Sequence, residues 1–167
     1  MNNLIIKRLF LLLSLVALFH SMAFGQSKPV FLSLKLGETT YQDALTQIQN
    51  STYGNYIKIH DGSIFIVGTS VKQNGGKVWD HADIHFQEGY VNNIQFSSAS
   101  ASGHSTDYIT KIYKETKSFF IPKNGYKFWL KKEENKNYYK YYGCAVVLEM
   151  FDSEVAGKVI RVQYIAL

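Results

Sequence analysis

Two histidines and an aspartate alternate along one short segment, with a spacing that suits a metal site on a strand. In "VWDHADIHF", residues 78–86, His81, Asp83 and His85 share one face of a predicted strand. Alternate residues of a strand point to the same side, so two histidines on this face can reach the same zinc ion, and a carboxylate or water can complete the coordination. Polar residues are equally expected wherever a strand face meets water. We therefore favour a solvated or partner-binding face, expect no cofactor, and keep metal binding as the alternative.

Aromatic side chains indicate a second use of that face. In the predicted strands, several aromatic residues occupy the positions that aliphatic residues leave free. Large aromatic side chains with a polar group are enriched in protein interfaces, because they bury much area at low entropic cost. Cross-strand packing that only shields the sheet is the alternative, and an error of one residue in register would exchange the two faces. The candidate partner-binding residues are Trp79, His81, His85, Trp129, Tyr139 and Tyr141, with Tyr56 on the same register.

Nucleophilic catalysis has little support in the sequence. Cys144 lies in the apolar segment "GCAVVLEM", where a thiol behaves as a small buried hydrophobic group. The nucleophile-elbow pattern G-x-S-x-G and the glycine-rich phosphate-binding motifs do not occur in the sequence. We therefore expect a protein that is not an enzyme and has no catalytic residues.

The first half of the chain predicts one helix followed by four antiparallel strands. The segment "GETTYQDALTQIQN" opens with two threonines that can cap a helix, and its apolar residues then recur with helical spacing. Two β-rich runs, "YIKIH" and "SIFIV", are joined by Asp61-Gly62, a strong hairpin signal. The last two strands of this half are "VWDHADIHF" and "YVNNIQF".

The second half repeats this order. Ser105 or Thr106 can cap a helix whose buried face carries Ile109 and Tyr113. A strand "YKFWLKK" follows the helix. The segment "YYKYYGCAVVLEM" is predicted to form one long strand bent at Gly143, and "GKVIRVQYIAL" forms the last strand.

A short phrase occurs in both halves. "GYVNNIQF", residues 89–96, returns as "GKVIRVQY", residues 157–164, with glycine, valine, a branched residue, glutamine and an aromatic at the same offsets. Each half is so small that, folded alone, it would be only marginally stable. Two halves that join their sheets edge to edge would extend the core and cover one exposed edge. We therefore favour a duplication, and the alternative is chance similarity between two amphipathic strands.

These observations predict an α+β fold. Two tandem α-β repeats would form one continuous antiparallel sheet with both helices packed on one face, and the opposite face would be open. The predicted boundaries are a cleavable signal peptide at 1–25, a first repeat at 26–97, a linker at 98–105 and a second repeat at 106–167.

The N-terminal residues predict export to the periplasm or the medium. The basic pair Lys7 and Arg8 precedes an apolar run at 9–19, and the small residues Ala23 and Gly25 stand where a signal peptidase would cut. The run is too short to span a bilayer, so we expect no membrane span after cleavage. An uncleaved anchor is the alternative.

The charge of the exported chain excludes some partners. Removing two basic residues with the signal leaves 16 of the 18 basic residues against 13 acidic ones, without a concentrated basic stripe. We therefore expect no nucleic-acid binding. The single cysteine excludes an internal disulfide, so burial of the core must supply the stability.

In the segments "LGETTYQDAL" and "VWDHADIHF" and in the repeated phrase, the chain resembles the secreted β-lactamase inhibitor protein fold group. It is also similar to envelope assembly lipoproteins of the SmpA/OmlA type. The resemblance covers roughly residues 30–167 and implies an exported, non-catalytic protein-binding module, either an enzyme inhibitor or an envelope accessory protein. The inhibitor's disulfides and the lipoproteins' lipidated cysteine have no counterpart here, so no contact residue is transferred. The alternative function is a periplasmic protein that binds a small ligand or metal through His81, Asp83 and His85.

Overall fold

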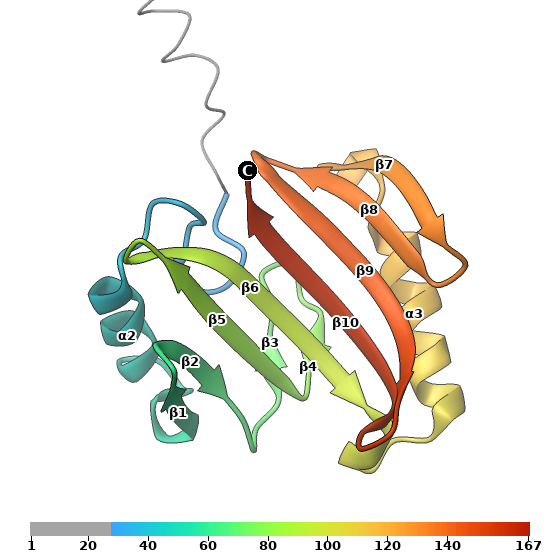
Figure 1. Cartoon of the computed structure of the whole chain (residues 1–167), viewed down its shortest axis with the longest axis horizontal. Coiled ribbons are helices and arrows are strands. Elements are labelled where there is room, and N and C mark those ends of the chain that lie inside the picture. Colours follow the sequence, from blue (N-terminus) through green and yellow to red (C-terminus); the bar gives the residue numbers. More distant parts are fainter. Residues whose placement is uncertain (1–27) are drawn as a thin grey trace, which may run out of the picture.

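The chain folds into one large antiparallel sheet with two α-helices (Figure 1). The computed structural model describes residues 28–167, except for the side chains of residues 131–133. The predicted signal peptide therefore lies outside the described residues. The α+β class and the continuous antiparallel sheet are confirmed, and the sheet has eight strands.

The strand order in the sheet is β1-β2-β5-β6-β10-β9-β8-β7, and every neighbouring pair is antiparallel. The two strands nearest the middle, β6 and β10, come from the two halves of the sequence. The eight strands are β1 (Ile57–His60), β2 (Ser63–Ile66), β5 (His81–Gln87), β6 (Tyr90–Ala99), β7 (Tyr126–Glu133), β8 (Lys136–Tyr141), β9 (Cys144–Ser153) and β10 (Gly157–Ala166).

Both predicted helices form, and their caps explain where they begin. In α2 (Tyr41–Gln49) the Thr40 hydroxyl accepts a hydrogen bond from the backbone N–H of Asp43. In α3 (Thr106–Phe119) Ser105 accepts from the N–H of Tyr108 in the same way. Such caps satisfy N–H groups that have no partner inside the helix.

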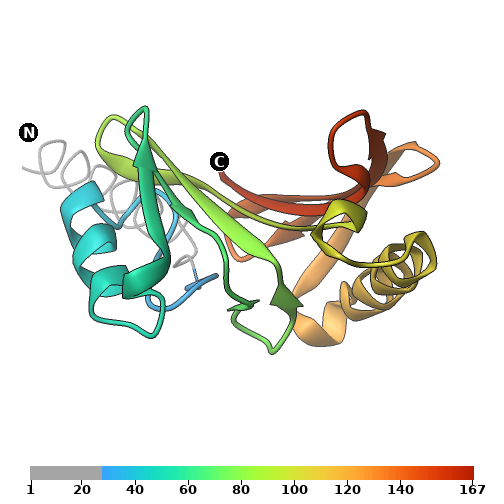
Figure 2. The same ribbon diagram turned by 90° about the horizontal axis from the view of Figure 1, so that it is seen from below.

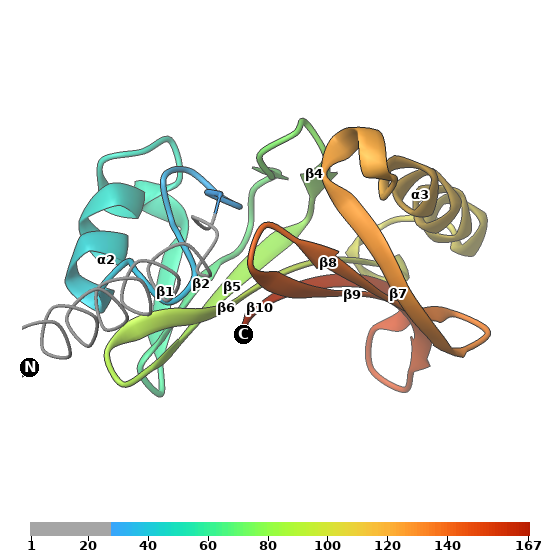
Figure 3. The same cartoon turned by 90° about the horizontal axis from the view of Figure 1, so that it is seen from above.

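The helices and a small hairpin occupy one side of the sheet. This hairpin, β3 (Val71–Lys72) with β4 (Val78–Trp79), lies between α2 and α3 (Figure 2). Among the described residues, no helix covers the other side of the sheet (Figure 3). Three short 3-10 helices complete the fold: η1 (Gly54–Tyr56), η2 (Ser100–Ser102) and η3 (Pro122–Asn124).

One predicted strand is a hairpin instead. The segment expected to run from Tyr138 to Met150 as a single bent strand reverses at Tyr142 and Gly143 and forms β8 and β9. Both turn residues have positive φ, 39° and 82°, as do Asp61 and Gly62 in the predicted β1–β2 turn. Two consecutive positive φ values define the tight turn whose twist suits a hairpin.

The expected linker at 98–105 begins as part of a strand. Strand β6 continues through Ser98 and Ala99, which pair with Ile160 and Val159 of β10. Only the residues from Ser100 onward connect the sheet to α3. The small residues of this segment therefore extend the pairing between β6 and β10.

The core lies between the sheet and the helices. Its large side chains include Phe96 and Tyr164, which face each other from β6 and β10 with ring centroids 6.3 Å apart. Gln73 of the small hairpin donates to the Tyr164 hydroxyl and accepts from the Trp79 indole at 3.0 Å. These bonds tie the hairpin to the sheet and satisfy its buried polar groups. Across residues 28–167, no helix has the length and apolar character needed to cross a membrane.

The turn between β9 and β10 yields a prediction about stability. Gly157 has φ +66°, and a Cβ added there would collide with Ser100 Oγ, whereas Gly62 has φ +70° and open space. Alanine at either position carries backbone strain of about 1–2 kcal/mol. We expect Gly157→Ala to lower the free energy of urea unfolding by at least about 1 kcal/mol more than Gly62→Ala, because of this steric collision.

Repeating both substitutions in a Ser100→Ala variant separates the steric collision at Gly157 from the backbone strain that both positions share. In a Ser100→Ala chain the obstructing oxygen is gone, so the extra cost of Gly157→Ala over Gly62→Ala should shrink. An unchanged difference would show that the close approach to Ser100 does not constrain this turn.

Candidate functional site

The face of the sheet opposite the helices, here called the open face, is the candidate site. Residues that pair directly across an antiparallel sheet point to the same side. One such row crosses six strands and is listed from β8 to β2 as Tyr138, Val147, Gln163, Gln95, Asp83 and Phe65. A polar centre with an aromatic ring at each end therefore runs across the open face.

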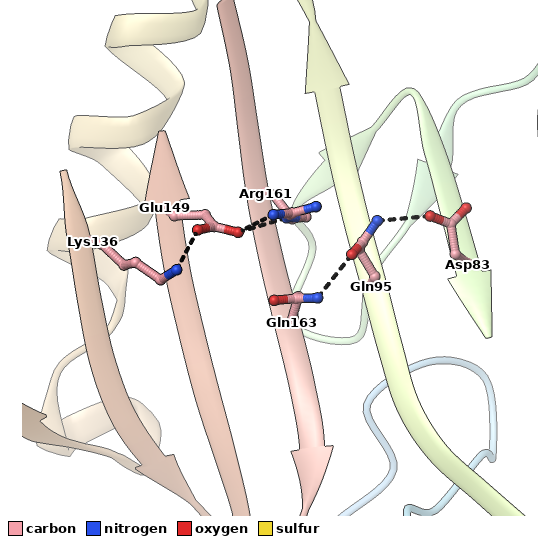
Figure 4. Close-up of polar contacts among 6 residues, drawn as sticks. All are labelled: Asp83, Gln95, Lys136, Glu149, Arg161 and Gln163. Atoms are coloured by element: carbon pink, nitrogen blue, oxygen red, sulfur yellow. Dashed lines mark hydrogen bonds and ion pairs between the residues drawn. The ribbon is translucent and has the colours of Figure 1, made fainter. Parts of the chain in front are cut away.

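A neighbouring row places three charges together (Figure 4). Glu149 of β9 lies between Lys136 of β8 and Arg161 of β10, and its side chain is only 9% exposed. Lys136 Nζ is 3.1 Å from one carboxylate oxygen, and Arg161 Nε donates to the other at 2.6 Å. Two cations therefore hold one buried carboxylate through charge-assisted contacts.

The central row carries its own chain of hydrogen bonds (Figure 4). Gln163 Nε2 donates to Gln95 Oε1 at 2.9 Å, and Gln95 Nε2 donates to Asp83 Oδ2 at 2.7 Å. Together with the charged row, these bonds connect side chains from five neighbouring strands. We call the six residues the polar strip: Lys136, Glu149, Arg161, Gln163, Gln95 and Asp83.

His81 and His85 lie on the open face on either side of Asp83, as the alternation predicts. Burial raises the pKa of Asp83 above its ordinary value, while the two histidines, the Gln95 hydrogen bond and Arg161 act to lower it. The His85 ring bonds Ser63 Oγ at 3.0 Å through Nδ1. Within the described part of the chain, no group of three histidine, cysteine or acidic side chains is arranged to hold a metal ion. The alternative site at His81, Asp83 and His85 is thus not preformed.

Trp79 does not belong to the open face, so its prediction as a partner-binding residue is wrong. It is 1% exposed and lies in the core, on β4 of the small hairpin. The alternation fails because Asp80 separates β4 from β5. The Asp80 carboxylate accepts from the Ala99 N–H at 3.2 Å and lies 2.8 Å from His104 Nε2, so the chain changes direction there.

Tyr139 and Tyr141 are also on the wrong side for partner binding. Tyr139 is 3% exposed and packs edge-on against Phe120 behind the sheet, and Tyr141 packs against the core beside it. Because the turn between β8 and β9 has two residues, odd-numbered residues of β8 pair with even-numbered residues of β9. Tyr139 pairs with Val146, and paired residues point to the same side of the sheet, here the covered side. The prediction treated both segments as one strand and therefore exchanged the faces.

Trp129 is accessible and lies at the outer edge of the sheet. It lies in β7, is 50% exposed, and stands where the pairing with β8 skips a residue. Lys140 of β8 places its ammonium 4.8 Å from the centre of the Trp129 ring. Tyr56, at the end of η1, is exposed as well.

Cys144 is held as a buried, neutral thiol. Its Sγ donates to the Tyr141 carbonyl oxygen at 2.8 Å, and burial raises the pKa of the thiol to about 12. Because the thiolate is the nucleophile, this position is unsuited to covalent catalysis.

Sequence reasoning missed the residues at the centre of the site. Lys136, Glu149, Arg161 and Gln163 lie at alternating positions of strand-like segments, but the sequence alone did not reveal that they meet on one face. Gln95 and Gln163 were visible as the shared glutamine of the repeated phrase, and this was the available signal. What the sequence did not supply was the adjacency of β6 and β10, which brings the two glutamines together.

Comparisons with protein-family models, with curated proteins and with solved structures each found no match for this chain. The function is therefore argued from the geometry of the chain itself.

The charged row allows a prediction with a matched control. Both Glu149–Arg161 and Asp152–Lys158 link β9 to β10, but the Asp152 side chain is 79% exposed. We expect Glu149→Gln to lower the unfolding free energy by about 1–3 kcal/mol, since it removes the buried charge that Lys136 and Arg161 share. Asp152→Asn should cost about 0–0.5 kcal/mol, because exposed pairs contribute little. Equal costs in urea unfolding would mean that Glu149 does not organise the face.

Asp83 allows a prediction about pH. Because burial raises its folded pKa, the folded chain binds this proton more tightly than the unfolded chain, whose pKa is about 3.9. The stabilisation from Asp83 is complete below that value and is lost as the pH rises through the folded pKa. The unfolding free energy of the wild type, relative to Asp83→Asn, should therefore fall as the pH rises from the unfolded pKa of Asp83 through its higher folded pKa. A constant or rising difference would contradict the assignment.

Proposed function

We propose that this chain is an exported, non-catalytic module that binds another protein through its open face. The observation that carries the proposal is the central row of the open face, where a hydrogen-bonded polar centre lies between Tyr138 at one end and Phe65 at the other. Protein interfaces combine aromatic anchors with fixed polar groups in this way.

The polar strip supports binding because its side chains are already ordered by their neighbours. A partner that meets pre-positioned groups loses less side-chain entropy on association. The strip also leaves bonding capacity unused: the second carboxylate oxygen of Asp83 has no hydrogen bond among the described residues. This oxygen can accept from a partner's arginine, lysine or backbone N–H.

We also infer that the fold arose by duplication. The strand order reads the same from either edge if β1, β2, β5 and β6 correspond to β7, β8, β9 and β10. In the repeated phrase Gln95 corresponds to Gln163, and these two residues are direct partners in the sheet. If a two-fold axis relates the two halves and passes between β6 and β10, one residue of β6 must pair with the equivalent residue of β10. The pair Gln95 and Gln163 meets that condition. The β3–β4 hairpin would then be an insertion in the first half, where the second half has only Tyr142 and Gly143.

The resemblance to the β-lactamase inhibitor fold group and to SmpA/OmlA-type envelope proteins agrees with this organisation and remains a proposal. It supports a role as an enzyme inhibitor or an envelope accessory protein. The predicted signal at residues 1–25 supports location in the periplasm or the medium. The metal-binding alternative at His81, Asp83 and His85 finds no support in the geometry, because Asp83 bonds Gln95 and His85 bonds Ser63.

Site-specific cross-linking tests the open face. A photoreactive benzoylphenylalanine is placed at Phe65 or Tyr138, at the two ends of the central row, and the exported protein is irradiated in the cells that produce it. We expect the same discrete adduct from both positions, because both flank one partner.

The control position is Tyr108, an exposed tyrosine on α3, on the opposite side of the sheet. An adduct that forms equally at Tyr108, or irradiated samples without any adduct at Phe65 and Tyr138, would contradict binding through the open face.

A further inference from the structure

The outer edge of the sheet exposes three consecutive large apolar side chains. Phe128, Trp129 and Leu130 of β7 are 60%, 50% and 39% exposed. Neighbouring residues of a regular strand point to opposite faces, so three exposed apolar residues in succession are unusual. Exposed patches of this kind mark binding surfaces in soluble proteins. We call these three residues the apolar edge.

Irregular pairing explains why the apolar edge protrudes. The register between β7 and β8 shifts between Phe128 and Leu130, and again between Lys131 and Glu133. Such bulges twist an edge strand and interrupt its regular row of N–H and C=O groups, which disfavours the addition of another strand. The side chains of β7, more than its backbone, are therefore what a partner would contact.

Lysines surround the apolar edge, and the carboxylates nearest in the sequence are Glu133, at the end of β7, and Glu134. Lys127 pairs directly with Lys140 across the strands, although like charges in that position destabilise a sheet. Within residues 28–130 and 134–167, neither lysine forms an ion pair with a carboxylate. The sequence has no aspartate or glutamate at 119–130 or at 136–146. An uncompensated lysine pair favours an anionic partner.

A shallow recess adjoins the two lysines. It is lined by Pro122, Gly125, Lys127, Lys140, Tyr142 and Gly143. Gly125 has φ +86°, and the Tyr142 ring packs so closely on it that any Cβ would collide with the ring. Lys28 lies 3.9 Å above the same ring and adds a further positive charge. The recess thus offers ammonium groups beside an aromatic wall.

We propose that the apolar edge and its lysines dock the exported chain onto an anionic lipid surface, with a lipid phosphate between Lys127 and Lys140. Tryptophan prefers the boundary between headgroups and acyl chains, because its ring is apolar and its N–H is polar. Lysines beside it are attracted to anionic lipids. Apolar insertion and basic attraction together give reversible peripheral binding without a spanning segment. The apolar edge adjoins the open face, since Leu130 pairs with Tyr138. It shares no residue with the polar strip, and lipid binding can be measured without the proposed protein partner.

Vesicle binding tests this proposal with the chain from Gln26 to Leu167, which contains every described helix and strand. Vesicles of phosphatidylglycerol mixed with excess phosphatidylcholine are compared with vesicles of phosphatidylcholine alone. We expect co-sedimentation with the anionic vesicles only. Trp79 is buried, so a change in tryptophan emission on binding reports Trp129. The emission should shift to shorter wavelength, be quenched by brominated lipid, and show neither change in Trp129→Phe.

Matched charge variants locate the docking surface. We expect Lys127→Gln/Lys140→Gln to lower partitioning onto anionic vesicles about thirtyfold. The control, Lys111→Gln/Lys114→Gln, removes the same charge from exposed positions on α3 and should change partitioning little. Circular dichroism of each variant verifies that it is folded.

Three results would overturn the proposal. The first is equal binding to anionic and neutral vesicles, and the second is an equal loss of partitioning in the two double lysine variants. The third is Trp129 emission that brominated lipid does not quench. Self-association that Trp129→Ala abolishes, without vesicle binding, would assign the edge to a second copy of the chain instead.

Discussion

The pairing of β6 with β10 is the constraint on which both faces of this protein depend. It runs without interruption from Ala99 opposite Val159 to Asn93 opposite Ile165. In this register Phe96 and Tyr164 meet in the core, and Gln95 and Gln163 meet on the open face. A shift of one residue in either strand would bring a glutamine into the core and an aromatic ring to the surface. The core and the candidate site are therefore fixed by one set of backbone hydrogen bonds.

The polar strip shows how an open face can be both polar and ordered. A strand face in contact with water usually carries side chains that move independently. Here Glu149 is shared by two cations from the flanking strands, and Gln95 donates to Asp83 while accepting from Gln163. Each of these bonds joins neighbouring strands, so the strip follows the curvature of the sheet. A partner would meet a surface whose shape is set before it binds.

Local patterns predicted the elements well, because the signals for helices and tight turns are local. The caps at Thr40 and Ser105 and the Asp61-Gly62 turn each act over a few residues. The errors arose where one unrecognised turn changed the direction of a whole segment. At Tyr142 and Gly143 the reversal moved Tyr139 to the covered face, and at Asp80 the change of direction placed Trp79 in the core. A face assignment carries across a segment only if no turn interrupts the alternation.

The candidate site was less predictable than the fold, because it depends on which strands are neighbours. Arg161 and Glu149 are joined by the β9–β10 hairpin, which alternation alone could have paired. Gln95 and Asp83 likewise share the β5–β6 hairpin. The link between these two groups crosses from β10 to β6, and the residues it joins are 68 positions apart in the sequence. Only the repeated phrase, which contains both glutamines, pointed to that contact. The polar strip is therefore best understood as a product of the junction between halves: each hairpin supplies one part, and the β6–β10 pairing makes them continuous.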